Sequence, residues 1–515
     1  MNEVIMFFLA ILPIIWLVIA LTGLKMPGHV ACPITLVISA VLAAVVWHMD
    51  SVNLLTAGLE GIVMALWPIS LVIIAAIFTY NLCLHTGAMD VIKRMLTTVS
   101  CDKRILVLII AWGFGGFMEG MAGFGTAVAI PAGILCGLGF EPVFAAVVCL
   151  IANSTPTAFG SIGIPTITLA NITGLDVMKV AFATTVQIAP LVVLTPFLMV
   201  ILTGKSVKAL KGVWGITLAS GLAFSIPQML AAKFMGAELA NILGSICAMA
   251  IIILISKFSK KEVPDEYKME LPEEMTSVKT TAKEGLRAWS PFILIFILLV
   301  VTSKAIPVVH DTLGAVKTSV RIYQGEGGSD TVFSWIVTPG ILIFLAAIIG
   351  GKIQKASFKE IGCVFVDSVK QMAKTVLTIA SIMAAAKIMS YSGMIGEIAT
   401  VFVAITGSFY PFVAPLIGSI GSFVTGSGTS SSVLFGGLQL QTAQTLNMDP
   451  TWLCAANSVG ADAGKMISPQ SIAIAIAAIN KPGLEGKIMS KSIRYYLLFI
   501  VLMGIICYTG LMLFC

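Results

Sequence analysis

GFGGFMEGMAGFGT, at residues 113–126, places six glycines around one acidic residue, Glu119, in a chain that is otherwise strongly apolar. Glycine in a helix interior costs about 1 kcal/mol relative to alanine, and it adopts backbone conformations that other residues avoid. The stretch therefore predicts a helix that breaks and reverses. The carboxylate at the break makes it a candidate functional site.

The composition places the chain in a membrane. Of its 515 residues, 58% are hydrophobic and 11% are charged, and the mean hydropathy is +1.01. The first apolar run, residues 4–24, is too long for a signal peptide and lacks the basic start of one, so it is interpreted as the first span. We expect an all-α polytopic membrane protein with about 12–14 transmembrane segments.

Long apolar runs recur along the chain, and about 20 such residues cross the hydrocarbon core as a helix. The expected spans are residues 4–24, 29–47, 61–84, 104–118, 177–202, 213–232, 236–257, 291–308, 333–350, 375–391, 396–418 and 495–514. Two stretches, 119–172 and 420–478, are too rich in glycine, proline and polar residues to be simple spans.

The distribution of lysine and arginine predicts the orientation, because cytoplasmic loops collect these residues. Basic clusters lie at residues 93–104, 205–211, 257–287, 352–359 and 481–494, which we place in the cytoplasm. Residues 49–53 and 310–330 and both termini then lie outside. The segment 257–289 mixes both charge signs and is poor in large apolar residues, so it is interpreted as a charged, flexible cytoplasmic linker between halves at 1–256 and 290–515.

The two halves share an internal repeat. GGFMEGMAGFGTAVAI (115–130) matches GSFVTGSGTSSSVLFG (421–436), and CLIANSTPTAFGSIGIPTI (149–167) matches LCAANSVGADAGKMISPQSI (453–472). An acid followed by proline, Glu141-Pro142 and Asp449-Pro450, opens the apolar stretch between the motifs of each copy. Each half is predicted to hold a re-entrant hairpin, at about 113–137 and 419–440, and a broken helix, at about 149–172 and 453–478.

Basic residues flank the two copies with opposite bias. Residues 85–104 carry four of them and the matching 391–410 none, whereas 172–180 carry one and 480–494 carry four. By the positive-inside rule, corresponding points of the copies lie on opposite sides of the membrane. This pattern predicts an inverted-topology repeat, which typically builds secondary transporters with the binding site at the broken helices.

A small carboxylate is the expected guest of these breaks, because free N–H groups at half-helix N-termini and hydroxyl groups attract anions. A single glycine motif would be more typical of close helix packing, but two matched copies favour a site. The candidate substrate-binding residues are Gly123, Gly125, Thr126, Asn153, Ser154, Thr155, Thr429, Ser430, Ser431, Ser432, Asn457, Ser458 and Lys465.

Acidic residues inside a membrane usually serve ion or proton pathways. Glu119 is the first candidate for proton coupling, and Asp462 is the second. Lys465 is expected either to pair with Asp462, three residues earlier, or to meet the substrate carboxylate. Glu60 is expected at the interface, and Lys374 and Lys387 are expected to snorkel toward it.

Other classes of function lack support in the sequence. The ten cysteines are scattered without a CxxC motif, and the four histidines are not paired at helical spacing. These patterns favour neither disulfides nor a metal or haem site. No nucleophile and base or cofactor motif indicates an enzyme, and no nucleic-acid partner or cofactor is expected.

Several motifs also resemble the lactate permease family of bacterial membrane transporters. They are FMEGMAGFGT with AIP, then GLGFEP and LIAN with FGSIGIP, and in the second half TGSGTSS with LFG and GKMISPQSIAIA. The resemblance covers residues 55–510. It implies proton-coupled symport of L-lactate and related 2-hydroxy acids such as glycolate across the cytoplasmic membrane. It further implies inverted repeats with re-entrant hairpins, in which a transport domain moves against a scaffold.

The sequence therefore predicts a secondary active transporter that couples uptake of a small monocarboxylate to protons. Two alternatives stay open. A sodium-coupled transporter of small organic anions uses the same broken helices, since unwound carbonyls also coordinate Na⁺. An anion channel belongs to another class, and pores also use broken helices. The preferred hydroxy acid and the oligomeric state are not fixed by the sequence.

Overall fold

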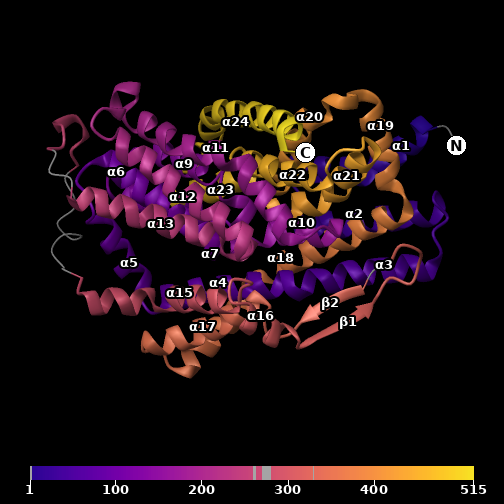
Figure 1. Cartoon of the computed structure of the whole chain (residues 1–515), viewed down its shortest axis with the longest axis horizontal. Helices are drawn as coiled ribbons and strands as arrows, with labels where there is room; N and C mark the ends of the chain where they lie inside the picture. The colour runs from indigo at the N-terminus through magenta and orange to yellow at the C-terminus, as the bar shows by residue number, and fades with distance from the viewer. Residues whose placement is uncertain (1–2, 259–261, 270–279, 329, 515) are drawn as a thin grey trace.

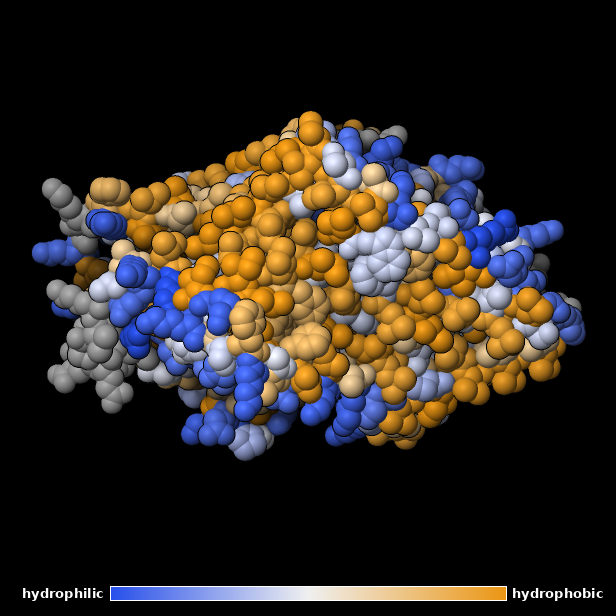
Figure 2. Space-filling view, turned by 90° about the horizontal axis from the view of Figure 1, so that it is seen from below, coloured by the Kyte–Doolittle hydropathy of each residue, from blue (hydrophilic) through white to orange (hydrophobic). Residues whose placement is uncertain are grey.

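The computed structural model describes residues 3–258, 262–269, 280–328 and 330–514 (Figure 1). Within these ranges, eleven helices are long and apolar enough to cross a membrane, or twelve if one strongly bent pair counts as a span. Figure 2 shows a broad apolar surface on one face, with polar residues gathered toward its ends. The expectation of an all-α polytopic membrane protein is thus confirmed, at the lower limit of the expected number of spans.

The secondary-structure elements in the described part of the first half are all helices. Its elements are α1 (Glu3–Val18), η1 (Ile19–Gly23), α2 (Gly28–Val45), α3 (Ser51–Met64), η2 (Ala65–Ser70), α4 (Leu71–His85), α5 (Ala88–Thr97), α6 (Lys103–Val107), η3 (Leu108–Phe114), α7 (Gly115–Met121), α8 (Thr126–Gly137), α9 (Pro142–Ala152), η4 (Thr157–Phe159), α10 (Gly160–Thr173), α11 (Val177–Gly204), η5 (Val207–Leu210), α12 (Trp214–Phe234) and α13 (Ala237–Phe258).

The second half adds one small antiparallel hairpin, in which Lys317 of β1 pairs with Ser334 of β2. Its elements are η6 (Asp265–Tyr267), α15 (Ala282–Thr302), α16 (Pro307–Gly314), β1 (Lys317–Arg321), β2 (Asp330–Ser334), α17 (Pro339–Ile353), α18 (Phe358–Ser392), α19 (Met394–Thr406), η7 (Gly407–Phe409), α20 (Tyr410–Thr425), α21 (Gly428–Thr445), α22 (Pro450–Lys465), α23 (Pro469–Ile479) and α24 (Glu485–Phe514).

Several expected boundaries were wrong. The span at 333–350 instead begins with the end of β2 and continues as the shorter α17, which starts at Pro339. The span at 375–391 belongs to α18, which begins at Phe358 because Ser357 and Glu360 form a capping box. Polar residues in the first turns of α18, as in those of α24, hide the helix from a search for apolar runs.

The segment predicted as a linker at 257–289 is shorter than expected, because α13 continues to Phe258 and α15 begins at Ala282. Residues 259–261 and 270–279 of it lie outside the described residues. The described piece between them packs on the start of α6. Tyr267 lies under the Arg104 guanidinium, 3.9 Å from the ring centre, and the Met269 amide donates to the Cys101 carbonyl at 2.9 Å.

The glycine-rich stretch at 113–126 is the tip of a hairpin. Helix α7 ends at Met121, and Gly123 and Gly125 take φ values of +61° and +85° before α8 begins at Thr126. The two limbs pack against each other. Lys103, at the start of the first limb, and Gly139, after the second, line one groove. The chain therefore enters and leaves at the same end of the bundle, as a re-entrant hairpin does.

The second half has a hairpin of the same form. Helix α20 ends at Thr425, and the chain turns at Gly426, with φ +68°, before α21. The far ends of the limbs lie together, because the Tyr410 hydroxyl contacts Gln439 Oε1 at 2.8 Å. After each hairpin comes the predicted acid and proline. Glu141 caps α9 and Asp449 caps α22, each accepting two backbone N–H bonds.

Each capped helix is followed by a break. Between α9 and α10 the chain bends by 66°, and Ser161, Ile162 and Gly163 take positive φ values. In the second copy the break lies between α22, which ends at Lys465, and α23, which begins at Pro469. The four segments pack crosswise, since α8 contacts α23 and α10 contacts α21. All four breaks thus meet where the two halves join.

Helices α20 and α22 touch through their backbones. A Cβ at Gly418 would collide with the Asn457 carbonyl, and a Cβ at Gly460 or Gly464 would collide with the carbonyl of Pro415 or Ser419. Small residues let transmembrane helices approach this closely. The contact joins the second hairpin to the second broken helix without intervening side chains.

A pair of long helices runs antiparallel beside this centre (Figure 1). The unit α3–η2–α4, Ser51–His85, which is kinked at Trp67, and α18, Phe358–Ser392, are each 35 residues long. At one end Gly61 lies against the Ala384 backbone, and at the other Asn81 Nδ2 donates to Ser368 Oγ at 2.9 Å. Because these two contacts run in opposite order along the two segments, the segments are antiparallel.

Candidate functional site

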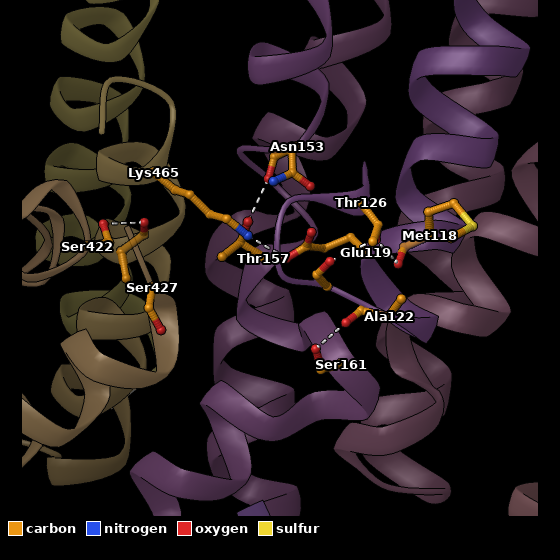
Figure 3. A network of polar contacts seen from close by, with 12 residues as sticks. Met118, Glu119, Ala122, Thr126, Asn153, Thr157, Ser161, Ser422, Ser427 and Lys465 are labelled. Carbon is orange, nitrogen blue, oxygen red and sulfur yellow. Dashed lines mark hydrogen bonds and ion pairs between the residues drawn. The ribbon is translucent and has the colours of Figure 1, made fainter. Parts of the chain in front are cut away.

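An ion pair joins the two halves at the breaks (Figure 3). Lys465 Nζ lies 2.6 Å from Glu119 Oε1, and the side chains are 9% and 2% exposed. Glu119 stands two residues before the end of α7, and Lys465 is the last residue of α22. Gly160 makes room for the carboxylate, because a Cβ there would lie 2.6 Å from Glu119 Oε1. Such burial of charge is costly unless the pair is intact.

The ion pair lies on the wall of a cavity of about 310 Å³. Both hairpin tips line it, through Gly125 of the first and Gly426 of the second. The two broken helices, α2 and α18 supply most of the remaining wall. A volume of this size is within the usual range of small-molecule sites. The cavity is therefore built between the two hairpins, the two broken helices, α2 and α18.

Five of the residues proposed from the sequence line this cavity, namely Gly125, Thr429, Ser430, Lys465 and Glu119. The other candidates lie behind the wall. Thr126 is half-buried and the others are buried. These candidates are Gly123, Thr126, Asn153, Ser154, Thr155, Ser431, Ser432, Asn457, Ser458 and Asp462.

Some of the buried candidates bond within their own half. Ser154 donates to the Ile151 carbonyl at 2.6 Å, and Ser431 donates to the Gly418 carbonyl at 2.6 Å. Thr126 donates to the Gly123 carbonyl at 2.7 Å and so fixes the first hairpin tip. These side chains shape the breaks instead of facing the cavity.

Asp462 does not form the ion pair with Lys465 that was one of the two expectations for this lysine. Lys465 reaches Glu119 and not Asp462. The Asp462 carboxylate is completely buried, and within the described residues neither of its oxygens makes a well-formed hydrogen bond, although the Ala158 backbone interacts with it. Helical spacing favoured a pair between Asp462 and Lys465, but Lys465 instead contacts Glu119 of the other half.

Sequence reasoning missed several polar residues of the cavity. Lys374, Thr375 and Thr378 of α18 and His29 of α2 line the side opposite the hairpins. Lys374 had been expected to snorkel, but it faces the cavity. The missed hydroxyl and amide groups on the repeat side are those of Thr157, Ser161, Thr425, Ser427, Gln470 and Ser471. The sequence feature that could have identified these residues is their position after the Asn-Ser motifs and beside Gly426.

A second buried ion pair lies away from the cavity. Lys387 Nζ is 2.8 Å from Glu60 Oε1, and the Tyr391 hydroxyl donates to the same carboxylate at 3.0 Å. Glu60 is thus buried and not interfacial, and Lys387 is paired and does not snorkel. This pair joins α3 to α18 and provides a natural comparison for Glu119 and Lys465.

The bent segment of α10 separates two cavities. Pro165 lines the cavity at the ion pair, whereas its neighbour Ile164 lines a second cavity of about 300 Å³. His310 and Thr338, which flank the β hairpin, also line the second one. Within the described residues, no group of three His, Cys, Asp or Glu side chains is arranged to hold a metal ion.

Known proteins resemble the chain over nearly its whole length. The family model described as L-lactate permease matches residues 6–514. An L-lactate permease of Streptococcus iniae is 49% identical and the alignment covers 87% of this chain and 93% of the relative. An L-lactate permease of Bacillus subtilis is 35% identical, and the glycolate permease GlcA of Escherichia coli is 34% identical; each alignment covers 96% of this chain and 94% of the relative.

Two solved transporter structures share the fold. The Neisseria gonorrhoeae MtrF structure aligns with a TM-score of 0.52 over 93% of this chain and 94% of its own, at 14% identity. The Alcanivorax borkumensis YdaH transporter aligns with a TM-score of 0.53 over 93% and 98%, also at 14% identity. At this identity the likeness shows the architecture alone.

Proposed function

Because this chain belongs to the L-lactate permease family, we propose that it takes up L-lactate and related 2-hydroxy acids such as glycolate by proton symport. It is a multi-pass membrane transporter and not an enzyme, since its relatives are named permeases. The membrane is bacterial, and we assign it as the cytoplasmic membrane with both termini outside. The observation that carries proton coupling is the Glu119–Lys465 ion pair on the cavity wall.

The ion pair supports coupling because its charges match those of the transported species. With Glu119 ionised, Lys465 is neutralised and has little attraction for a second carboxylate. A proton on Glu119 releases Lys465, which then binds the substrate carboxylate in its place. The loaded and empty sites carry the same net charge. Crossing hydrocarbon in either state avoids the cost of an unbalanced ion, so one proton moves with one monocarboxylate.

The packing of the long helices supports the inverted repeat. The α3–η2–α4 unit and α18 each precede one copy of the hairpin and broken helix, and they have equal length. They lie side by side and antiparallel, as corresponding elements do when two copies are related by an axis in the membrane plane. We propose that the repeats bound the site from opposite sides of the membrane and that α10 separates the two access routes.

Lys374 of α18 is proposed to contact the substrate carboxylate from the side opposite the hairpins. Its charge faces the cavity, and it forms no ion pair within the described residues. Lys374→Gln is expected to raise the KM for L-lactate about 5-fold, because a charged hydrogen bond at an exposed position is weakened by solvent. Initial uptake rates over a range of L-lactate concentrations measure this.

Lys370→Gln is the matched control, since Lys370 is an exposed lysine one turn earlier on α18 and outside the cavity wall. Its KM should equal that of the unmodified protein, and Lys374→Arg should retain most of the affinity. An unchanged KM in Lys374→Gln would remove Lys374 from the substrate site.

The test of the function is uptake of labelled L-lactate into proteoliposomes under an inward proton gradient without sodium. A gradient of one pH unit is expected to concentrate lactate about 10-fold, because one unit corresponds to 1.36 kcal/mol. A protonophore should collapse the accumulation. Uptake that requires sodium at clamped pH would establish the sodium-coupled alternative. Flux that never exceeds equilibrium and does not saturate would establish a channel.

A further inference from the structure

Another polar recess lies at the open ends of the first hairpin. It is a groove of about 720 Å³ between the starts of α6, α9 and α24 and the end of α11. None of its lining residues lines the substrate cavity. The basic clusters at these helix ends place this side of the bundle in the cytoplasm by the positive-inside rule.

Five cations line the groove, namely Lys103, Lys205, Lys487, Lys491 and Arg494. Three of them, at spacings of four and three residues, form one face of the first turns of α24. Within the described residues, none of the five lies within 4 Å of a carboxylate oxygen. Their charges are therefore available to a ligand.

Among the described residues, the only carboxylate on the groove wall already accepts hydrogen bonds from the backbone. Glu141 caps α9, with Oε2 accepting from the Phe144 amide at 2.7 Å and Oε1 accepting from the Val143 amide at 3.2 Å. A cap at a helix N-terminus is stabilised by the helix dipole. Glu141 is thus held by the backbone, and its single negative charge is outnumbered by the five cations, so the described wall of the groove carries a net positive charge.

The other wall of the groove is apolar. Phe140 and Phe144 stack with ring centres 5.7 Å apart, and Val147, Leu202 and Met269 extend the surface. Beyond Arg494 the face of α24 becomes a run of apolar residues with exposed leucine and isoleucine side chains. Cations at the membrane surface therefore adjoin an apolar wall that leads into the hydrocarbon.

From this juxtaposition we propose that the groove binds the phosphate headgroup of an anionic phospholipid of the cytoplasmic leaflet. The cations hold the phosphate, and the aromatic wall receives the upper part of an acyl chain. Basic pockets between helices on the cytoplasmic side recognise lipid headgroups in this way. A soluble phosphate would use the cations but not the apolar wall. The bound lipid ties both ends of the first hairpin to α24.

The experiment uses the full-length protein, delipidated in detergent and titrated with phosphatidylglycerol or phosphatidylcholine, with bound lipid counted by native mass spectrometry. Wild type is expected to retain phosphatidylglycerol and to release phosphatidylcholine. The triple variant Lys487→Gln, Lys491→Gln, Arg494→Gln should bind phosphatidylglycerol on the order of 100-fold more weakly, since each cation near an anionic surface contributes about a 5-fold factor. All three residues are exposed, so folding is preserved.

A control triple variant, Lys208→Gln, Lys359→Gln, Lys370→Gln, removes the same charge from exposed lysines outside the groove. It should bind phosphatidylglycerol as wild type does. An equal loss of phosphatidylglycerol binding in both triple variants would show diffuse electrostatic attraction and no specific site. Unchanged binding in both variants would also contradict the proposed site. If millimolar inorganic phosphate displaces the lipid at the groove, the site is a soluble-anion site and the proposal is overturned.

Discussion

Glu119→Gln is expected to abolish proton-driven accumulation of L-lactate while leaving exchange of lactate across the membrane intact. Glutamine has the shape of protonated glutamate, so Lys465 stays free to bind the substrate carboxylate, but no proton is bound or released. In proteoliposomes with a gradient of one pH unit, accumulation should fall from about 10-fold to about 1-fold. Counterflow of labelled against unlabelled lactate should continue at a comparable rate.

Glu60→Gln is the matched control for this experiment. It disrupts the other ion pair between a glutamate and a lysine, which is equally buried but lies outside the cavity. Its protein yield can fall, but the accumulation ratio per folded molecule should be unchanged. If Glu119→Gln concentrates lactate as well as wild type does, Glu119 is structural, and Asp462 becomes the candidate for proton coupling.

Lys465→Met is expected to lower the free energy of unfolding by about 3–5 kcal/mol, because it leaves the Glu119 charge buried without its partner. The double variant Glu119→Gln, Lys465→Met removes both charges and should recover most of this loss. Thermal unfolding of the purified protein in detergent, followed for the four members of the cycle, measures the coupling.

Lys374→Met gives the baseline for that cycle, since Lys374 is exposed and forms no ion pair within the described residues. Its unfolding midpoint should stay close to that of wild type. A double variant no more stable than Lys465→Met would show that the lost stability comes from packing of the lysine stem and not from the uncompensated charge. Transport by the double variant should be lost in any case, because no cation remains at the hairpins.

The local features of the fold were predictable from the sequence. Glycine at 123 and 125 adopts conformations with positive φ that end a helix, and Glu141 and Asp449 before proline start one. These effects act within a few residues, so their pattern is visible in the chain itself. In the structure, helices end at Met121 and Thr425 and begin at Pro142 and Pro450.

The partner of Lys465 was not predictable in the same way. Asp462 is three residues away, whereas Glu119 is 346 residues away, and only the crossing of the two halves decides between them. Lys374 was misassigned because an isolated lysine in a long helix gives no indication of which neighbour it faces. The roles proposed for these residues, unlike their positions, stay predictions until transport is measured.

The backbone contact between α20 and α22 has a consequence for movement. Side chains that change rotamer can let helices slide, but carbonyl groups seated against glycine Cα atoms offer no alternative arrangement. Helices α20 and α22 are therefore expected to move as one rigid body. Displacement must then take place along surfaces where side chains meet, and the surface that carries Glu119 and Lys465 is one of these. A proton that binds Glu119 would therefore change the charge at the contact between the two halves.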